Sequence, residues 1–402
     1  SVTGYYDRQY DRQFIDPDSA AFLGAVGLDG NAESTNTNST KQFSQEFRVI
    51  TNFNSPLNFV GGVLWSTSDT LTDGVVRETT GTHRQLVSMS GLEPSDVFYT
   101  LRFDISGDQL ALFGELQAAF LDDRLRITGG ARYFEQTFEF PTNPPVATAP
   151  ILEVFGRPSV GDPETFGKDR LMFDVSEILP KAQVEFDVNH DIMLFASAAR
   201  GARNGLFNNP VSLVFAGFGA GDPVFDKLVA YDPDSVWSYE AGLKALLLDG
   251  RMRLNAAVFH SHWSDVHTEL QFLTVGTTVN VDCAEIQGIE GEINYAINDH
   301  LLLFASGALQ NAEFTTEVPL MLDVSGMPNT FAPKGTPLPQ VAEESFFIGA
   351  EGRKPTRWGN VDLVGRITYS FTGERLNKLE SDDPDGSIIA QDNFLDSLGL
   401  LN

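Results

Sequence analysis

Two arginines, two asparagines and a phenylalanine stand close together in the middle of this 402-residue chain, within AARGARNGLFNN (residues 198–209). A guanidinium group can hold an anionic chelate, and an aromatic ring can stack on a flat ligand. The same side chains also suit a plainer role, in which they fasten the long loop that follows (residues 209–233) to the rim of the protein. The sequence leaves both roles open. The candidate ligand-binding residues are Arg200, Arg203, Asn204, Phe207 and Asn208.

Three histidines, His260, His262 and His267, form a second candidate. His260 and His262 are two residues apart, so a strand places them on one face, and imidazole pairs can bind zinc, copper or nickel. The spacing fixes no third ligand, and the same face carries Leu254 and Val258. We therefore expect no metal site, and we favour aromatic residues at a membrane interface over a metal pair.

Other features that could indicate an enzyme or a cofactor fail on their context. The glycines of AGFGAGD, Gly217, Gly219 and Gly221, lack the strand and helix that a dinucleotide loop requires. The acidic run Ser381–Gly386 could hold calcium, but an exposed acidic turn explains it equally well. The many carboxylates do not single out a catalytic pair. We expect no cofactor, no catalytic residue and no enzymatic activity.

The elements that must position these residues alternate strongly, most clearly over residues 231–271. Two alternating runs flank the tight turn Leu248-Asp249-Gly250, which predicts a β-hairpin. Each run exceeds the about 9–11 residues that a tilted strand needs to cross a bilayer. In the first run one face carries Tyr239, Ala241, Leu243, Ala245 and Leu247, and the other carries Ser238, Glu240, Gly242 and Lys244. One apolar and one polar face indicate a wall between lipid and a wet lumen.

The charged residues of the alternating runs all fall on the polar faces of their predicted strands. Facing lipid would cost Arg or Lys about 2–4 kcal/mol each at the bilayer midplane, so we expect them to line a lumen and form ion pairs between strands. The set comprises Glu46, Arg48, Arg126, Arg132, Glu240, Lys244, Glu290, Glu292, Asp362 and Arg366.

About fourteen such strands are predicted, from residues 1–14 to a weak last strand at Gln391–Leu400. Alternate connections are short, about three to seven residues, and the others run from about twelve to nearly forty. Outer-membrane barrels have this asymmetry, whereas soluble sandwiches have regular turns every 8–12 residues.

Composition narrows the possible functions. The net charge of −28 argues against nucleic-acid binding, which needs basic stripes. No stretch of 18 apolar residues is present, so we expect no transmembrane helix. The first residues lack the basic start and apolar core of a signal peptide. The single cysteine, Cys283, cannot form an internal disulfide.

Several motifs resemble the barrel strands of TonB-dependent outer-membrane receptors. The resemblance covers nearly the whole chain, including AEIQGIE (residues 284–290) and RGARNGLFN (residues 200–208). It departs from the family pattern at Asp234, usually Glu, and at Leu206, usually Gly. In the central hairpin it rests on Tyr231, Pro233, Ser238, Tyr239, Glu240, Gly242, Lys244, Asn255 and Phe259.

The resemblance implies an all-β fold, an antiparallel up-and-down transmembrane β-barrel of which about 14 of 22 strands are present. Residues 1–402 would then be a single barrel domain, part of a larger barrel, without a plug domain. The resemblance also implies a bacterial outer-membrane location, a TonB partner, contact with outer-membrane lipid and a monomeric barrel. The cargo would be a scarce, bulky nutrient such as a ferric siderophore or other metal chelate, and the segment at residues 200–208 would face the extracellular vestibule.

Two alternatives stay open. A passive porin or lipid-uptake channel would share the alternation but need no plug and no TonB. A soluble acidic β-protein acting on carbohydrate would share the strand content but need no detergent.

Overall fold

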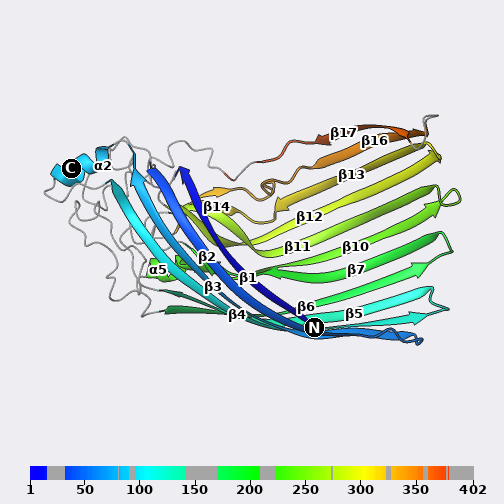
Figure 1. The fold of residues 1–402 in the computed structure, drawn as a ribbon, viewed down its shortest axis with the longest axis horizontal. Coiled ribbons are helices and arrows are strands. Elements are labelled where there is room, and N and C mark those ends of the chain that lie inside the picture. Colours follow the sequence, from blue (N-terminus) through cyan, green and yellow to red (C-terminus); the bar gives the residue numbers. More distant parts are fainter. Residues whose placement is uncertain are drawn as a thin grey trace.

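One large sheet contains most of the regular structure in the computed structural model (Figure 1). The structure describes residues 1–15, 32–79, 81–89, 96–141, 170–208, 223–272, 275–322, 327–355, 361–376 and 379. Thirteen strands follow one another across the sheet, each antiparallel to the next. They are β1 (Val2–Ile15), β2 (Ala32–Ile50), β3 (Leu57–Glu78), β4 (Val97–Phe120), β5 (Leu125–Pro141), β6 (Arg170–Asp187), β7 (Ile192–Arg203), β10 (Asp234–Leu247), β11 (Met252–Phe272), β12 (Val275–Asn298), β13 (Leu301–Phe314), β16 (Glu344–Pro355) and β17 (Asp362–Thr372).

The predicted all-β, up-and-down order is confirmed, and the strands pair in sequence order apart from short insertions. The predicted hairpin turn is also confirmed, because Leu248, Asp249 and Gly250 all have positive φ (55°, 54° and 82°). Leu121, Asp122 and Asp123 repeat this conformation without any glycine. The predicted strand at Gln391–Leu400 lies outside the described residues.

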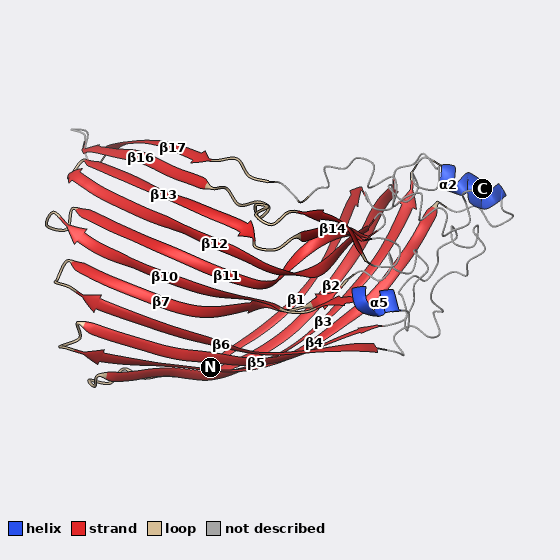
Figure 2. Cartoon of the chain, turned by 180° about the vertical axis from the view of Figure 1, so that it is seen from behind, coloured by secondary structure: helices blue, strands red, loops and turns tan. Residues whose placement is uncertain are grey.

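Apart from the link between β11 and β12, the short connections of the described residues gather at one end of the sheet, and the two described helices lie at the other (Figure 2). The helices are α2 (Thr82–Met89) and α5 (Pro223–Leu228). None of the helices among the described residues is long and apolar enough to cross a membrane. One predicted long connection is wrong: β11 and β12 are joined through residues 273–274 alone, since both strands extend far beyond their predicted ends. These short connections are residues 51–56, 121–124, 188–191, 248–251 and 299–300.

The registers align the alternating residues into two continuous faces. In the row through Val258, the partners Ala241 and Ile289 are apolar. We call the exposed apolar side the apolar belt; on β5 it runs from Leu125 to Tyr133, nine residues, close to the about 9–11 needed to span a bilayer at a tilt. The belt also includes Leu112, Leu116, Ile127, Val184, Leu194, Tyr239, Leu309, Phe346, Ile348, Ile367 and Tyr369, all exposed. The opposite side is the polar face.

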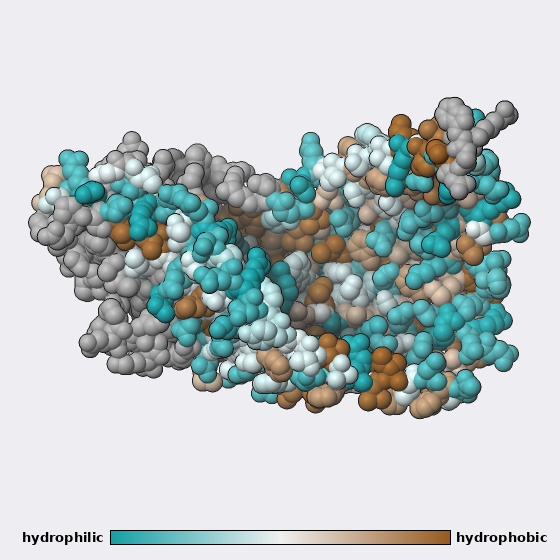
Figure 3. Space-filling view, in the orientation of Figure 1, coloured by the Kyte–Doolittle hydropathy of each residue, from teal (hydrophilic) through white to brown (hydrophobic). Residues whose placement is uncertain are grey.

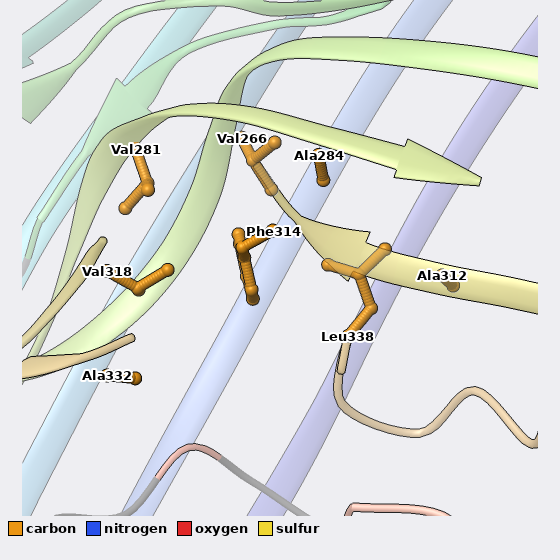
Figure 4. Packing of buried hydrophobic residues seen from close by; sticks show 8 residues of the cluster. All are labelled: Val266, Val281, Ala284, Ala312, Phe314, Val318, Ala332 and Leu338. Carbon is orange, nitrogen blue, oxygen red and sulfur yellow. The ribbon is translucent and has the colours of Figure 1, made fainter. Parts of the chain in front are cut away.

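An insertion between β13 and β16 packs on the sheet beyond the apolar belt. It forms a small hairpin of β14 (Val318–Leu322) and β15 (Pro328–Ala332), and β14 also pairs in parallel with the end of β11. Buried apolar side chains from both layers meet beneath it (Figure 4). These residues are Val266, Val281, Ala284, Ala312, Phe314, Val318, Ala332 and Leu338. Their packing explains why β11 and β12 continue so far beyond the belt.

Candidate functional site

The five predicted ligand-binding residues lie at the end of β7 and in the segment after it, away from the short turns. β7 ends at Arg203, and the segment continues through the two-stranded sheet of β8 (Leu206–Phe207) and β9 (Ala230–Tyr231) before β10 begins. Asp234, the first residue of β10, pairs in register with Arg203. The site is therefore a junction between β7, β9, β10 and β11. We call it the rim junction.

Asp234 is the centre of the rim junction and is only 2% exposed. Arg203 donates from Nε to both carboxylate oxygens, at 3.1 and 2.9 Å, and also from Nη2. The indole Nε1–H of Trp263 donates to the same carboxylate at 3.0 Å. The Arg203 guanidinium in turn lies 4.7 Å from the Trp263 ring centroid. Asp234, Arg203 and Trp263 thus fix three strands relative to one another.

His267 and Tyr231 complete the rim junction from the other side. The His267 Nε2–H donates to the Asp232 carbonyl oxygen at 2.8 Å, while its Nδ1 lies 3.7 Å from the Asp234 carboxylate. The Tyr231 ring meets the imidazole edge-on at 4.8 Å between centroids. Asn280 exchanges two hydrogen bonds with the Asp232 backbone, at 2.8 and 2.9 Å. Hydrogen bonds from β11 and β12 therefore fix the backbone at Asp232.

The electrostatics of Asp234 follow from this packing. The carboxylate lies above the apolar belt, whose part of β10 begins at Tyr239. Burial opposes ionisation of Asp234, but the hydrogen bonds from Arg203 outweigh it, so its pKa lies below the usual 3.8. Burial raises the pKa of Tyr231, which therefore stays a neutral phenol. The rim junction is accordingly a charged pair, Arg203 and Asp234, that lies close to a neutral phenol.

The other four predicted residues are also engaged by the protein itself. Arg200 donates to the Glu177 carboxylate at 2.7 Å, and Asn204 donates to the Gln136 side chain at 2.5 Å. Phe207 stacks on Phe140 with centroids 4.8 Å apart. Asn208 is buried and bonds to the backbone of Leu228 and Thr278, the latter in both directions at 2.7 and 2.8 Å. These contacts favour the loop-fastening role that the sequence left open.

Of the five residues, Arg203 alone is exposed, with 54% of its side chain accessible. Ligand binding by the five stays a prediction, and Arg203 is the member best placed for it. Sequence reasoning missed Trp263 and His267 as partners and noted Asp234 only as a departure from a motif. Because 31 residues separate Arg203 from Asp234, only the strand register brings them together.

The histidine pair lies on the apolar side, as its spacing predicts. His260 stacks with Tyr239 at 6.5 Å, beside Trp237, whose ring stacks on Tyr239 at 6.0 Å. His262 Nδ1 lies 3.8 Å from the Glu285 carboxylate. Within the described part of the chain no three His, Cys, Asp or Glu side chains form a group able to hold a metal ion. Gly217, Gly219, Gly221 and Ser381–Gly386 lie outside the described residues.

The polar face lines a hollow of about 640 Å³ between β7 and β17. A deep hollow is also visible near the centre of Figure 3, between the surface over β1–β3 and the surface over the later strands. The carboxylates of Glu240, Glu290 and Glu292 border the 640 Å³ hollow together with Lys244 and Asn255. This part of the sheet offers a wide, hydrated concavity and no assembled catalytic group among the described residues.

The predicted ion pairs form only in part. Arg126 bridges to Glu185 at 3.0 Å and to Asp187 at 2.6 Å across β5 and β6, and Arg366 lies 3.9 Å from Glu351. Lys244 instead lies over the ring of Phe195, 5.3 Å from its centroid. Arg48 pairs within its own strand, with Glu46. Asp362 pairs with Arg353 across β16 and β17. Aromatic rings thus take the place of some predicted carboxylate partners.

Three solved structures with the same fold are distant from this chain in sequence. The ferric yersiniabactin uptake receptor FyuA from Yersinia pestis is 16% identical with a TM-score of 0.63, covering 92% of this chain and 46% of that one. The copper transporter OprC is 15% identical with a TM-score of 0.56, covering 87% and 47%. The siderophore receptor PiuA from Acinetobacter baumannii is 14% identical with a TM-score of 0.54, covering 87% and 49%. At these identities the likeness shows the fold alone, and the chain spans about half the length of these proteins. Among curated protein sequences, none matches this chain.

The family model for the TonB dependent receptor-like β-barrel matches residues 1–396, nearly the whole sequence. This range includes the thirteen strands of the up-and-down sheet and the residues of the rim junction. Receptors of this kind reside in the bacterial outer membrane. This chain belongs to the TonB-dependent receptor family and forms part of its β-barrel.

Proposed function

We propose that this chain is the barrel wall of a transporter that imports a scarce, bulky nutrient across the outer membrane with energy delivered by TonB. The observation that carries the proposal is the two-sided sheet: a continuous apolar belt of bilayer-spanning height backs a polar face around a 640 Å³ hollow. Such a wall separates lipid from a hydrated passage. It binds and conducts its cargo without breaking bonds, so we propose no enzymatic activity.

A metal chelate, such as a ferric siderophore, is the cargo class we favour. The similar solved structures support it, since they are a ferric yersiniabactin uptake receptor, a copper transporter and a siderophore receptor. In this chain, Arg203 offers a half-exposed guanidinium at the rim junction, where an anionic chelate would enter. Arg200, Asn204, Phe207 and Asn208 would support that residue by fixing the surrounding segment.

The two outer strands of the sheet lead us to propose that the barrel is larger. Among the described residues β1 pairs only with β2 and β17 only with β16. Unpaired backbone groups are very costly in hydrocarbon, so further strands must cover both edges. Since β1 and β17 occupy the first and thirteenth places of an alternating sheet, they run in the same direction. Antiparallel closure therefore requires an odd number of additional strands. A barrel closed in this way has no free strand edge that could pair with a second copy, so we propose a monomer.

The test is uptake of radiolabelled ferric chelates by cells that express the full-length protein, with and without TonB. We expect uptake that depends on both proteins, and a purified protein whose unheated gel band migrates faster than the boiled one. Equal uptake without TonB would instead identify a passive channel. A protein that stays soluble without detergent and shows no heat-dependent shift would refute the membrane wall itself and leave the soluble carbohydrate-active alternative.

A further inference from the structure

Strand β1 contains a tandem sequence repeat that has no part in the proposed transport function. Its sequence YDRQYDRQF repeats Tyr-Asp-Arg-Gln from Tyr6 and again from Tyr10. A period of four on a strand returns each residue type to the same face, so the arginines and aromatic rings alternate on one side. We call Tyr6, Arg8, Tyr10, Arg12 and Phe14 the arginine–aromatic ladder.

The ladder's side chains stack on one another along the strand. The Arg8 guanidinium lies 4.7 Å from the centroid of Tyr10, and Arg12 lies 4.8 Å from that of Phe14. Arg8 also donates to the Tyr6 hydroxyl at 3.4 Å. A guanidinium placed over a ring keeps its planar fork of N–H donors at the edge of its plane, and Arg8 uses one of these donors for Tyr6. Two preoriented forks thus stand about 13 Å apart, the rise of four strand residues.

Neither arginine has a carboxylate within ion-pair distance among the described residues. The two aspartates of the repeat lie on the opposite face, where Asp7 accepts from Tyr5 at 3.3 Å and Asp11 accepts from Thr37 at 2.7 Å. Both arginines are exposed. Their charge is available to a ligand.

The neighbouring strand adds uncharged hydrogen-bonding groups to the same face. In register with the ladder, from Tyr6 to Phe14, β2 presents a row of amides and hydroxyls. This row also interlocks with β3, where Thr72 donates to Asn38 at 2.8 Å and Thr40 bonds to Thr70 at 3.2 Å. Amides and hydroxyls both donate and accept, so the row suits a hydroxyl-rich partner. Its accessible members are Gln42, Thr40, Asn38 and Asn36, whereas Ser34, opposite Phe14, is buried.

The ladder belongs to the polar face and not to the apolar belt. Val2 and the ladder residues all have even numbers, so they lie on the same side of β1. Val2 pairs with Glu46, and Glu46 lies on the polar face. β1 stands at one edge of the sheet, in front in Figure 1. A ligand would therefore reach the ladder from the water-filled side. A lipid headgroup would approach from the opposite face.

We propose that the arginine–aromatic ladder and the amide–hydroxyl row of β2 bind an extended, hydroxyl-rich polycarboxylate, such as an acidic oligosaccharide. Its carboxylates would take the two guanidinium forks, its hydroxyls the amide row, and its ring faces the exposed parts of Tyr6 and Tyr10. This binding goes beyond the proposed transport function, because it can be measured on the purified protein without TonB.

The test uses the full-length protein extracted from membranes in mild detergent, with hexagalacturonate as probe and isothermal titration as readout. We expect binding that weakens with salt, and roughly a tenfold loss of affinity for each of Arg8→Gln and Arg12→Gln. The matched control is the double variant Arg77→Gln/Arg102→Gln. It removes as much charge as Arg8→Gln and Arg12→Gln do together, but from β3 and β4 and from arginines that lie near Asp96 and Asp73 (3.8 and 3.5 Å), on the other face. That variant should bind as the wild type does. The heat-dependent gel shift verifies that all variants fold.

Four results would overturn the proposal. The first is no binding of hexagalacturonate by the folded wild-type protein. The second is equal binding of neutral maltohexaose, which would show that the arginines contribute nothing. The third is equal loss in the Arg77→Gln/Arg102→Gln control, which would reduce the effect to net charge. Binding of lipopolysaccharide that competes with hexagalacturonate would also contradict the assignment, since the ladder faces away from the apolar belt.

Discussion

Gly62 on β3 gives the sharpest test of how the wall is built. A Cβ at this position would lie 2.5 Å from the Phe47 carbonyl oxygen and 2.6 Å from Cζ of Phe113. Both contacts are far inside van der Waals distance, and the carbonyl belongs to a paired backbone that cannot move alone. Overpacking of this kind costs about 1–3 kcal/mol, so Gly62→Ala should lower the free energy of unfolding by that amount.

The adjacent glycine provides the matched control. A Cβ on Gly61 meets nothing closer than the Phe113 carbonyl oxygen at 3.5 Å. Gly61→Ala should therefore raise stability by about 0.4–1 kcal/mol, by restricting the unfolded chain. Urea unfolding of the full-length protein in lipid vesicles, followed by loss of the fast-migrating unheated band, measures both. Adding Phe113→Leu to Gly62→Ala should recover only part of the loss, because the carbonyl contact stays. If Gly62→Ala unfolds at the same urea concentration as Gly61→Ala, the close packing inferred here is wrong.

Two further predictions concern the apolar belt and the rim junction. Val258→Lys places a charge in the belt, at a position 54% exposed, and should lower the stability of the folded protein by about 2–4 kcal/mol. Ala257→Lys on the polar face should change the stability by no more than about 0.5 kcal/mol. The recovery of folded protein from membranes compares the two variants, and equal recovery would contradict the two-faced wall. Asp234→Ala removes the acceptor shared by Arg203 and Trp263 and should lower the free energy of unfolding by about 1.5–3 kcal/mol, and Asp234→Asn should lower it by less. The urea concentration at the midpoint of unfolding measures this loss. An unchanged midpoint would show that the rim junction has no structural role. Because the pKa of Asp234 is lowered in the folded protein, its stabilising contribution is complete above pH 3.8 and is lost as the pH falls through the lower folded value. Acid should therefore destabilise the wild type more than it destabilises Asp234→Ala. If the stabilities of the two proteins fell in parallel with pH, this prediction would be refuted.

The strands were predictable because alternation is a local signal. Residues 231–271 show their two faces without any knowledge of neighbours, and the turn at Leu248–Gly250 marks the hairpin directly. Strand length was not predictable in the same way. Beyond the belt, β11 and β12 lack a clean alternation of apolar and polar residues, and their extension depends on the β14–β15 hairpin that packs over Val266 and Val281. A tertiary contact therefore decided where these strands end.

The rim junction shows the corresponding limit for sites. The sequence singled out Arg203 for its chemistry, yet the choice between ligand and anchor depended on what stands opposite it. Register alone places Asp234 there, and a diagonal neighbour, Trp263, comes from a third strand. Residue type thus predicted which side chains matter, while the pairing of β7, β10 and β11 determined what they contact.

The polar face itself breaks the simple alternation rule, and the structure gives the reason. Five of the phenylalanines on this side each stand directly opposite a glycine on the next strand, with the ring within 3.2 Å of where that glycine's Cβ would be. The ring can therefore lie flat over bare backbone and bury apolar area without projecting into the hollow. Arg48, Lys244 and Arg366 cover three of these rings, 5.8, 5.3 and 4.8 Å from the centroids. The pairs are Phe113–Gly62, Phe138–Gly107, Phe195–Gly242, Phe259–Gly288 and Phe304–Gly349. Such pairs reconcile an aromatic-rich wall with a wet interior: the glycine supplies the recess, the ring fills it, and the cation restores a polar surface toward the passage.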